Sequence, residues 1–225
     1  MKNSKRLSVD YHFFQLASIS SRYYAVKSGG REISMVVLEA FINEEALMKN
    51  KIHIFGASGS GTTTIAKNIC EQINYKHFDS DNYLWLPTEE PFTVMRPKEE
   101  YLSLMGDDLN NNEKWILSGH VSFGFVDVYL SLYDLIVFVY VPMDIRIERL
   151  KKRECERYGE EILPGNKRFE KYNDFIEYAL SYDTASGGRS LEKHEKWLNG
   201  VDCPVLRIIN NSLDDSINAV LEAIG

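Results

Sequence analysis

Cysteine, long apolar runs and excess positive charge are all scarce in this 225-residue sequence. Its three cysteines lie far apart and form no Cys-x-x-Cys or Cys/His cluster, so the sequence indicates neither a disulfide framework nor a zinc site. No apolar run reaches the roughly 20 residues that a membrane-spanning helix needs. The first residues also lack the apolar stretch of a signal peptide. We therefore expect a cytoplasmic protein with no membrane partner.

The net charge of −7 gives no broad attraction to nucleic acid, so we expect no nucleic-acid partner. Any site for an anionic ligand must then be local. The length accommodates one sizeable α/β core with an appendage. The composition favours no particular oligomeric state.

Apolar runs and helix-like stretches alternate after residue 50, which predicts a parallel sheet flanked by helices. The fold class we expect is α/β, a P-loop NTPase fold with a doubly wound, mostly parallel five-stranded sheet and helices on both faces. The continuous apolar run at 135–141 predicts a central strand buried on both faces. Strands are expected at 51–55, 75–79, 115–118, 135–141 and 204–209, and helices at 62–73, 98–110, 122–131, 144–158 and 213–224.

The interval of about 158–190 interrupts this alternation, because it is rich in charge, aromatic residues and glycine. Pro164-Gly165 and Gly187-Gly188 are typical of hinges. The pattern therefore predicts a mobile lid inserted into the domain.

A glycine-rich turn joins the first expected strand to the first expected helix. Its three glycines let the backbone N–H groups point inward, and the following helix adds its positive N-terminal end. This arrangement predicts a P-loop that binds ATP or another NTP. The expected nucleotide-binding residues are Gly56, Ala57, Ser58, Gly59, Ser60, Gly61, Thr62, Thr63 and Thr64.

Two threonines decide what this loop is expected to do. Thr63 occupies the hydroxyl position of GxxxxGK[ST], which predicts a ligand for Mg²⁺. Thr62 stands where the pattern has lysine, so the cation that contacts the β- and γ-phosphates is missing. Binding survives this loss more readily than catalysis. The missing lysine therefore favours alternatives to an enzyme that transfers the phosphoryl group efficiently. These are a nucleotide-binding regulatory module, a weak NTPase, and a structural turn that binds no ligand.

With this motif, residues 48–225 resemble the small P-loop kinases, the group of adenylate, cytidylate and shikimate kinases. The chain looks more closely like bacterial adenylate kinase-like P-loop ATPase proteins, which share Gly-Ala-Ser-Gly-Ser-Gly-Thr-Thr-Thr, Trp85-Leu86-Pro87, Leu117-Ser118-Gly119 and Arg189-Ser190-Leu191. The resemblance implies a kinase that uses ATP with Mg²⁺. It implies a small-molecule hydroxyl or a nucleoside monophosphate as the acceptor.

Asp79-Ser80-Asp81 is similar to the Asp-x-Asp of shikimate and gluconate kinases. In those enzymes the first carboxylate holds a magnesium-bound water, and the second faces the acceptor hydroxyl. The resemblance thus implies a metal role for Asp79 and a catalytic and substrate-binding role for Asp81. The alternative is an acidic turn that caps the next helix.

Two further positions are expected to bind the acceptor. Adenylate kinases end the third strand with an aspartate, whereas this chain reads Ser118-Gly119-His120 and so lacks that second acidic motif. Gly119 permits close approach of a phosphate. His120 could belong to the site, but an exposed turn residue explains it equally well. Arg96 stands where such kinases place acceptor-binding residues. The alternative for Arg96 is a solvated loop side chain.

Arg146, Arg149 and Arg153 are spaced to share one helix face, which favours an anion nearby. A similar stretch in adenylate kinases implies that Arg149 stacks on adenine and that Arg153 contacts the transferring phosphate, replacing the lost lysine. Arg189 is the second choice for this catalytic cation, swinging in as the lid closes. The alternative is a solvated surface balanced by glutamates. His194 and Trp197 are expected to form a packed pair.

Residues 1–47 mix aromatic and polar residues without sustained periodicity, and we treat them as an N-terminal extension of unknown role. Met48 directly precedes the first expected strand, the natural beginning of a nucleotide-binding domain. We therefore hypothesise that the native product begins at Met48. An intact mass matching all 225 residues would contradict this.

Overall fold

The computed structural model describes residues 48–119, 126–186 and 188–225. These residues belong to one compact unit, Ala46–Gly225. The expectations for residues 1–47, and for His120, lie outside the described residues and stay predictions.

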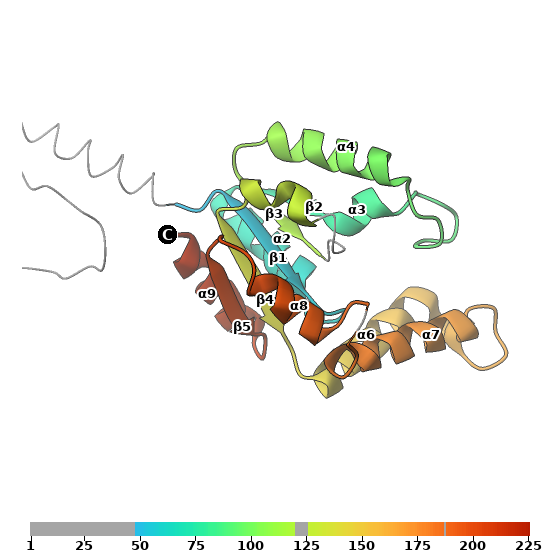
Figure 1. Ribbon diagram of the computed structural model, residues 1–225. Helices are drawn as coiled ribbons and strands as arrows, with labels where there is room; N and C mark the ends of the chain where they lie inside the picture. The colour runs from blue at the N-terminus through green and yellow to red at the C-terminus, as the bar shows by residue number, and fades with distance from the viewer. Residues whose placement is uncertain (1–47, 120–125, 187) are drawn as a thin grey trace, which may run out of the picture. The chain divides into compact units, whose positions relative to one another are not determined.

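Five parallel strands form one sheet in the order β2-β3-β1-β4-β5 (Figure 1). The expected fold class is thereby confirmed, and each expected strand is present within about one residue. β1 occupies the middle of the sheet, and the apolar β4 lies beside it. The strands are β1 Lys51–Gly56, β2 Lys76–Asp79, β3 Trp115–Ser118, β4 Leu135–Tyr140 and β5 Val205–Ile209.

Helices cover both faces of this sheet (Figure 1). Along β1, Ile52 and Ile54 pack with α2 and α9, whereas Phe55 packs with α4 and α8 on the other face, as the period of two in a strand requires. The helices are α2 Thr62–Ile73, α3 Ser80–Leu84, α4 Lys98–Asn110, α5 Val126–Tyr129, α6 Met143–Tyr158, α7 Phe169–Leu180, α8 Leu191–Leu198 and α9 Leu213–Ile224, with 3-10 turns η1 Leu130–Leu132, η2 Gly159–Ile162 and η3 Ser181–Asp183.

The interval predicted to be a lid contains more regular structure than the sequence pattern indicated. It carries α7, which lies beside α6 (Figure 1). Ile176 and Ala179 of α7 are buried against Ile147 and Leu150 of α6. The sequence reading missed α7 because charges surround a narrow apolar stripe at helical spacing.

Within the part of the chain that the structure describes, no helix combines the length and apolar character needed to cross a bilayer.

Candidate functional site

The phosphate loop lies between β1 and α2, and neighbouring backbone presses closely against it. A Cβ at Gly56 would lie 2.3 Å from the carbonyl oxygen of Val139, and one at Gly59 would lie 2.8 Å from that of Arg146. Gly59 and Gly61 also have φ of 83° and 88°, which side chains disfavour. The loop therefore requires these glycines for two separate reasons.

A buried asparagine that the sequence reading missed braces this loop. Asn210 follows β5 directly, and its Nδ2 donates to the Ser60 carbonyl at 2.8 Å. Ser216 donates to the Asn210 Oδ1 at 3.1 Å. Arg149, the expected adenine-stacking residue, donates from Nη2 to the Asn210 carbonyl at 3.3 Å. The available signal was a polar residue at the carboxyl end of a strand, where ligand sites of parallel sheets gather.

The loop and the start of α2 leave polar groups for a ligand to satisfy. Gly61 is the N-cap of α2 and supplies no side-chain acceptor, so the first backbone N–H groups of the helix need another partner. The Ser60 hydroxyl is buried with no hydrogen-bond partner among the described residues. A phosphate group could accept hydrogen bonds from the helix N–H groups and from the Ser60 hydroxyl. The residues present therefore fit a bound nucleotide.

Asp79 faces the loop from the carboxyl end of β2. Thr63 donates from its hydroxyl to the Asp79 Oδ2 at 3.2 Å, and Asp79 Oδ1 accepts from the Asp81 N–H at 3.1 Å. Asp79 is thus the N-cap of α3, as the alternative reading held, and it also contacts the loop's hydroxyl. Hydroxyl and carboxylate oxygens are donors that suit Mg²⁺, and phosphate oxygens and water would complete its ligands.

The end of β3 lies next to Asp79. Ser118 pairs in register with Asp79, and its buried hydroxyl shares a 2.9 Å hydrogen bond with His77 Nε2. Burial lowers the pKa of His77, while Asp79 raises it. Gly119 has φ 97°, and a Cβ there would lie 2.4 Å from the Ser80 hydroxyl. Close packing against α3 therefore explains this glycine, and its substrate-binding role stays a prediction.

A cavity of about 600 Å³ lies beside the phosphate loop. Ser58 contributes from the loop itself, and α3 with the segment after it forms one wall. α6, η2 and α7 supply other lining residues. The cavity also brings together the three residues expected to be catalytic: Asp81, Arg153 and Arg189.

Asp81 is exposed to this cavity. The surrounding protein walls displace enough water to raise the pKa of its carboxyl, and the negative charge of Asp79 adds to this. Arg189, Arg153 and Trp85 act in the opposite direction. The result is a carboxylate more basic than an ordinary aspartate, which is the property a proton acceptor needs.

The two expected catalytic arginines differ in how they are paired. Arg153 donates from Nε and Nη2 to one oxygen of the buried Glu154, at 2.9 and 2.7 Å. Arg189 has a buried Nε with no hydrogen-bond partner among the described residues. Burial lowers the pKa of Arg189, and Tyr178 and Asp81 oppose this. Arg189, the second choice from sequence, therefore keeps a donor that no described residue satisfies, whereas Arg153 is already paired.

Arg146 does not form a cationic row with Arg149 and Arg153. It is fully buried, donates to the Val141 carbonyl at 3.0 Å and to the Ala179 carbonyl at 3.3 Å, and forms an ion pair with Asp183. The spacing of the three arginines on α6 is as expected, but Asp183 of η3 neutralises Arg146 separately from the other two. Arg146 therefore anchors η3 to α6.

Arg96 is placed in a local network. Its Nε donates to the Tyr83 carbonyl at 2.9 Å, and it forms an ion pair with Glu100. It is not among the residues found to line the cavity. Its expected role in acceptor binding therefore stays a prediction without geometric support.

His194 and Trp197 pack together on one aromatic ring, as expected. Their rings meet Phe55 edge-on, with centroids 5.0 and 5.3 Å away. His194 Nδ1 also shares a 2.7 Å hydrogen bond with the Tyr182 hydroxyl. Burial lowers the pKa of His194 to about 3, with Arg189 and His53 adding to this, so it stays neutral. This pair packs against Phe55 of β1.

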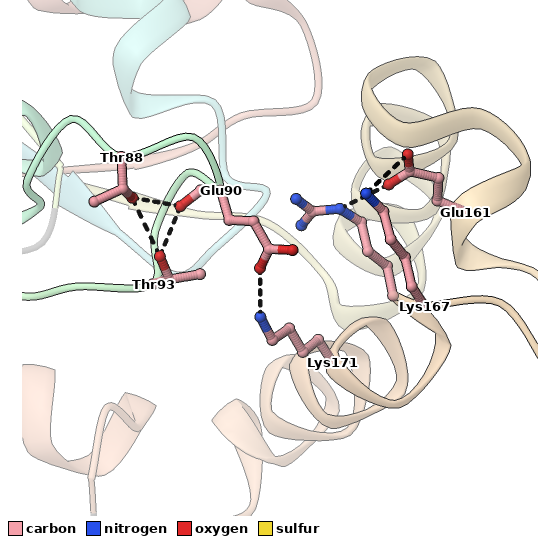
Figure 2. A network of polar contacts seen from close by, with 7 residues as sticks. Thr88, Glu90, Thr93, Glu161, Lys167 and Lys171 are labelled. Atoms are coloured by element: carbon pink, nitrogen blue, oxygen red, sulfur yellow. Dashed lines mark hydrogen bonds and ion pairs between the residues drawn. The ribbon is translucent and has the colours of Figure 1, made fainter.

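One ion pair joins the two walls of the cavity. Figure 2 shows Glu90, from the segment after α3, pointing toward Lys171 of α7. The Lys171 Nζ donates to the Glu90 carboxylate at 2.9 Å. Both side chains are largely exposed. The contact ties α7 to the opposite wall, and its two side chains stay exposed.

Comparison with known proteins supports the fold. A family model described as "AAA domain" matches residues 52–173. The Bacillus subtilis (strain 168) protein named "Uncharacterized protein YqaC" is 44% identical over 177 residues, covering 78% of this chain and 97% of its own length.

Solved structures were also found to be similar. A shikimate kinase from Bacteroides thetaiotaomicron has a TM-score of 0.44 at 20% identity, covering 77% of this chain and 97% of its own. A gluconokinase from Sinorhizobium meliloti 1021 has a TM-score of 0.46 at 14% identity, covering 78% and 91%. The family match spans more than half of the sequence. This match places the chain in the AAA domain family, and the sheet order and the glycine-rich loop are those of a P-loop NTPase fold.

Proposed function

We propose that the protein is a kinase that transfers the γ-phosphoryl group of ATP, with Mg²⁺, to a hydroxyl of a small molecule. The observation that carries this is the position of Asp81: it lies in the cavity beside the phosphate loop, two residues after the Asp79 that contacts Thr63. A carboxylate at that place can receive a proton from a hydroxyl that attacks the bound nucleotide.

Each neighbouring group has a role in this proposal. The loop and the start of α2 hold the phosphates, and Thr63 with Asp79 holds Mg²⁺, which supplies charge neutralisation when bound. Asp81 orients the acceptor hydroxyl and accepts its proton, helped by its raised pKa. Arg189 supplies the positive charge that Thr62 cannot. A nucleoside monophosphate is the alternative acceptor.

A second candidate is a nucleotide-binding module without efficient transfer. Thr62 in place of the usual lysine favours it, and so does the pairing of Arg153 with Glu154, which occupies part of that cation's donors. The presence of a cavity with an exposed carboxylate favours the kinase. The two candidates predict opposite responses of ATP turnover to an acceptor.

The test is ATP turnover with and without a panel of nucleosides, nucleotides and small polyols. A kinase accelerates when its acceptor is present. Asp81→Asn should lower that accelerated rate roughly 100-fold while sparing ATP binding, because it removes a proton acceptor. Asp107→Asn, on an exposed position of α4, is the matched control and should leave turnover unchanged. Wild-type turnover of Asp81→Asn would return the acidic pair to a capping role.

A further inference from the structure

The geometry points to the class of acceptor: a molecule that carries a planar ring and an anionic group, with the ring against Phe92 and the anion at Arg157. The inference rests on the proposed function in taking the cavity as the acceptor site. It adds which chemistry that cavity selects. Four observations carry it: the conformation of Phe92, the pairing of Arg157, the other cavity cations and the size of the cavity.

Phe92 is held in a left-handed conformation, with φ 60°, which is costly for a bulky side chain. Its ring lines the cavity, is 44% exposed, and meets Trp85 edge-on at 6.1 Å. The tip of this segment is fixed because Thr88 and Thr93 both donate to the Glu90 carbonyl, at 2.6 and 2.7 Å (Figure 2). An aromatic ring kept exposed in a strained turn at a cavity wall indicates a surface for a ligand ring.

Arg157 lies over the face of Phe92, with its guanidinium carbon 5.3 Å from the ring centroid. Its ion pair with Glu154 has an N–O separation of 3.9 Å, too long for a hydrogen bond. The same Glu154 oxygen already accepts two bonds from Arg153. Among the described residues, the Arg157 donors therefore have no hydrogen-bond acceptor. A carboxylate or phosphate would provide one.

The other cations of the lid are already hydrogen-bonded. Arg168 donates to Glu161 at 2.9 Å and stacks on Tyr158, and Lys171 donates to Glu90. Of the cavity's cations, Arg157 and Arg189 are thus the two that make no hydrogen bond to another described residue. Arg189 lies near Asp81, where transfer would occur. This leaves Arg157 for a separate anionic group on the acceptor.

The size of the cavity agrees with such a molecule. Its volume of about 600 Å³ is in the range of small-molecule sites. The lining includes Trp85, Tyr172 and Phe175 besides Phe92, so apolar ring faces surround the charged groups. A neutral polyol would leave Arg157 unpaired and would place hydroxyls against these rings. A molecule with a planar ring and an anionic group would pack against the aromatic rings and pair with Arg157.

The probe for the test is phenyl phosphate, which combines the two features, compared with inorganic phosphate and with phenol. Calorimetry on the full chain measures binding with and without a saturating non-hydrolysable ATP analogue and Mg²⁺, so that the phosphate loop is filled in one arm. We expect phenyl phosphate to bind more tightly than either fragment in both arms. Arg157→Met should weaken it roughly tenfold, the loss expected for one charge-assisted hydrogen bond.

Phe92→Leu keeps an apolar side chain without a planar face, and it should reduce the preference of phenyl phosphate over phosphate. Arg207→Met is the matched control, because Arg207 lies on β5 with an ion pair to Glu195 and does not line the cavity. It should leave binding unchanged. No binding of phenyl phosphate, no preference for it over phosphate, or equal loss in Arg157→Met and Arg207→Met would overturn the inference. This experiment measures binding and not ATP turnover, so failure of the kinase assay would not by itself contradict the inference about the cavity.

Discussion

Backbone contacts hold the phosphate loop, whereas charged side chains form much of the cavity beside it. Carbonyls of Val139 and Arg146 press against loop glycines, and the buried Asn210 braces the loop from β5. Across the cavity, Glu90 and Lys171 make an exposed ion pair. Close-packed backbone has one arrangement, but exposed ion pairs exchange readily with water and ligands.

This contrast indicates a division of labour between the two regions. The loop presents preformed N–H groups, which suit any nucleoside triphosphate. The cavity presents side chains whose pairing a ligand can change, which suits selection of an acceptor and stabilisation of the transferring phosphoryl group. Changes in the loop should therefore abolish binding, and changes in the cavity should mainly alter transfer.

The strongest way to break the comparison is to crowd the loop. Gly59→Ala should abolish measurable ATP binding, because its Cβ would lie 2.8 Å from the Arg146 carbonyl, a backbone atom that cannot rotate away. Gly165→Ala is the matched control: its φ of 85° equals that of Gly59 within a few degrees, yet nothing lies within 4 Å. It should cost only about 1 to 2 kcal/mol of stability. Calorimetry with ATP separates the two, and equal affinities would refute the close-packing account.

The sheet and the phosphate loop could be predicted from the sequence, whereas the partners of the charged side chains around the cavity largely could not. Glycine spacing, strand alternation and helix periods are local, so the sheet and the loop followed from them. Partners distant in the chain are not local: Asp183, which pairs with the buried Arg146, lies 37 positions after it. Asn210 was missed for the same reason, since its contact with Ser60 spans 150 positions.

The cavity side is tested by Arg189 and Arg153, the two arginines expected to be catalytic. Arg189→Met should lower acceptor-dependent turnover roughly 100-fold with little loss of ATP affinity, because a cation near the reacting phosphate acts mainly in the transition state. Arg153→Met should lose less, since Glu154 already holds part of its charge. Methionine keeps much of the stem's packing. Steady-state kinetics measure the loss of turnover in each variant, and ATP titrations measure the loss of affinity.

Restoring the missing lysine sharpens the same test. Thr62→Lys should recover part of the activity in the Arg189→Met background, because the cation returns from the loop. If neither arginine variant loses turnover and Thr62→Lys changes nothing, the compensation argument fails and the non-catalytic module gains support.

The interior beneath the loop should respond to acid because it holds neutral histidines. Burial lowers the pKa of His53 to about 4 and, with smaller contributions from Arg189 and His53, that of His194 to about 3. Below pH 6.5 these two histidines bind protons in the unfolded chain but stay neutral in the folded chain. The free energy of unfolding therefore falls as the pH drops from 6.5 toward 4. Between pH 7 and pH 5 we expect a loss of about 2 kcal/mol for each histidine.

Urea unfolding at the two pH values measures this, and His53→Gln is the comparison variant. It keeps a donor for the Leu117 carbonyl, which lies 3.1 Å from His53 Nδ1, but it removes one titration. About half of the pH dependence should disappear. The same dependence in both proteins would show that His53 does not contribute.

The smallest effect is expected from the ion pair that joins the cavity walls. Glu90 and Lys171 are largely exposed, so water and salt already satisfy them when separated, and neither Glu90→Gln nor Lys171→Met should move the unfolding midpoint measurably. The KM for the acceptor should change by less than about threefold, and the double variant should match either single one, since each removes the same contact. The change should fade at high salt. A large, salt-independent loss of kcat in Lys171→Met alone would instead assign Lys171 to the reaction. The cavity wall would then be as fixed in its function as the phosphate loop.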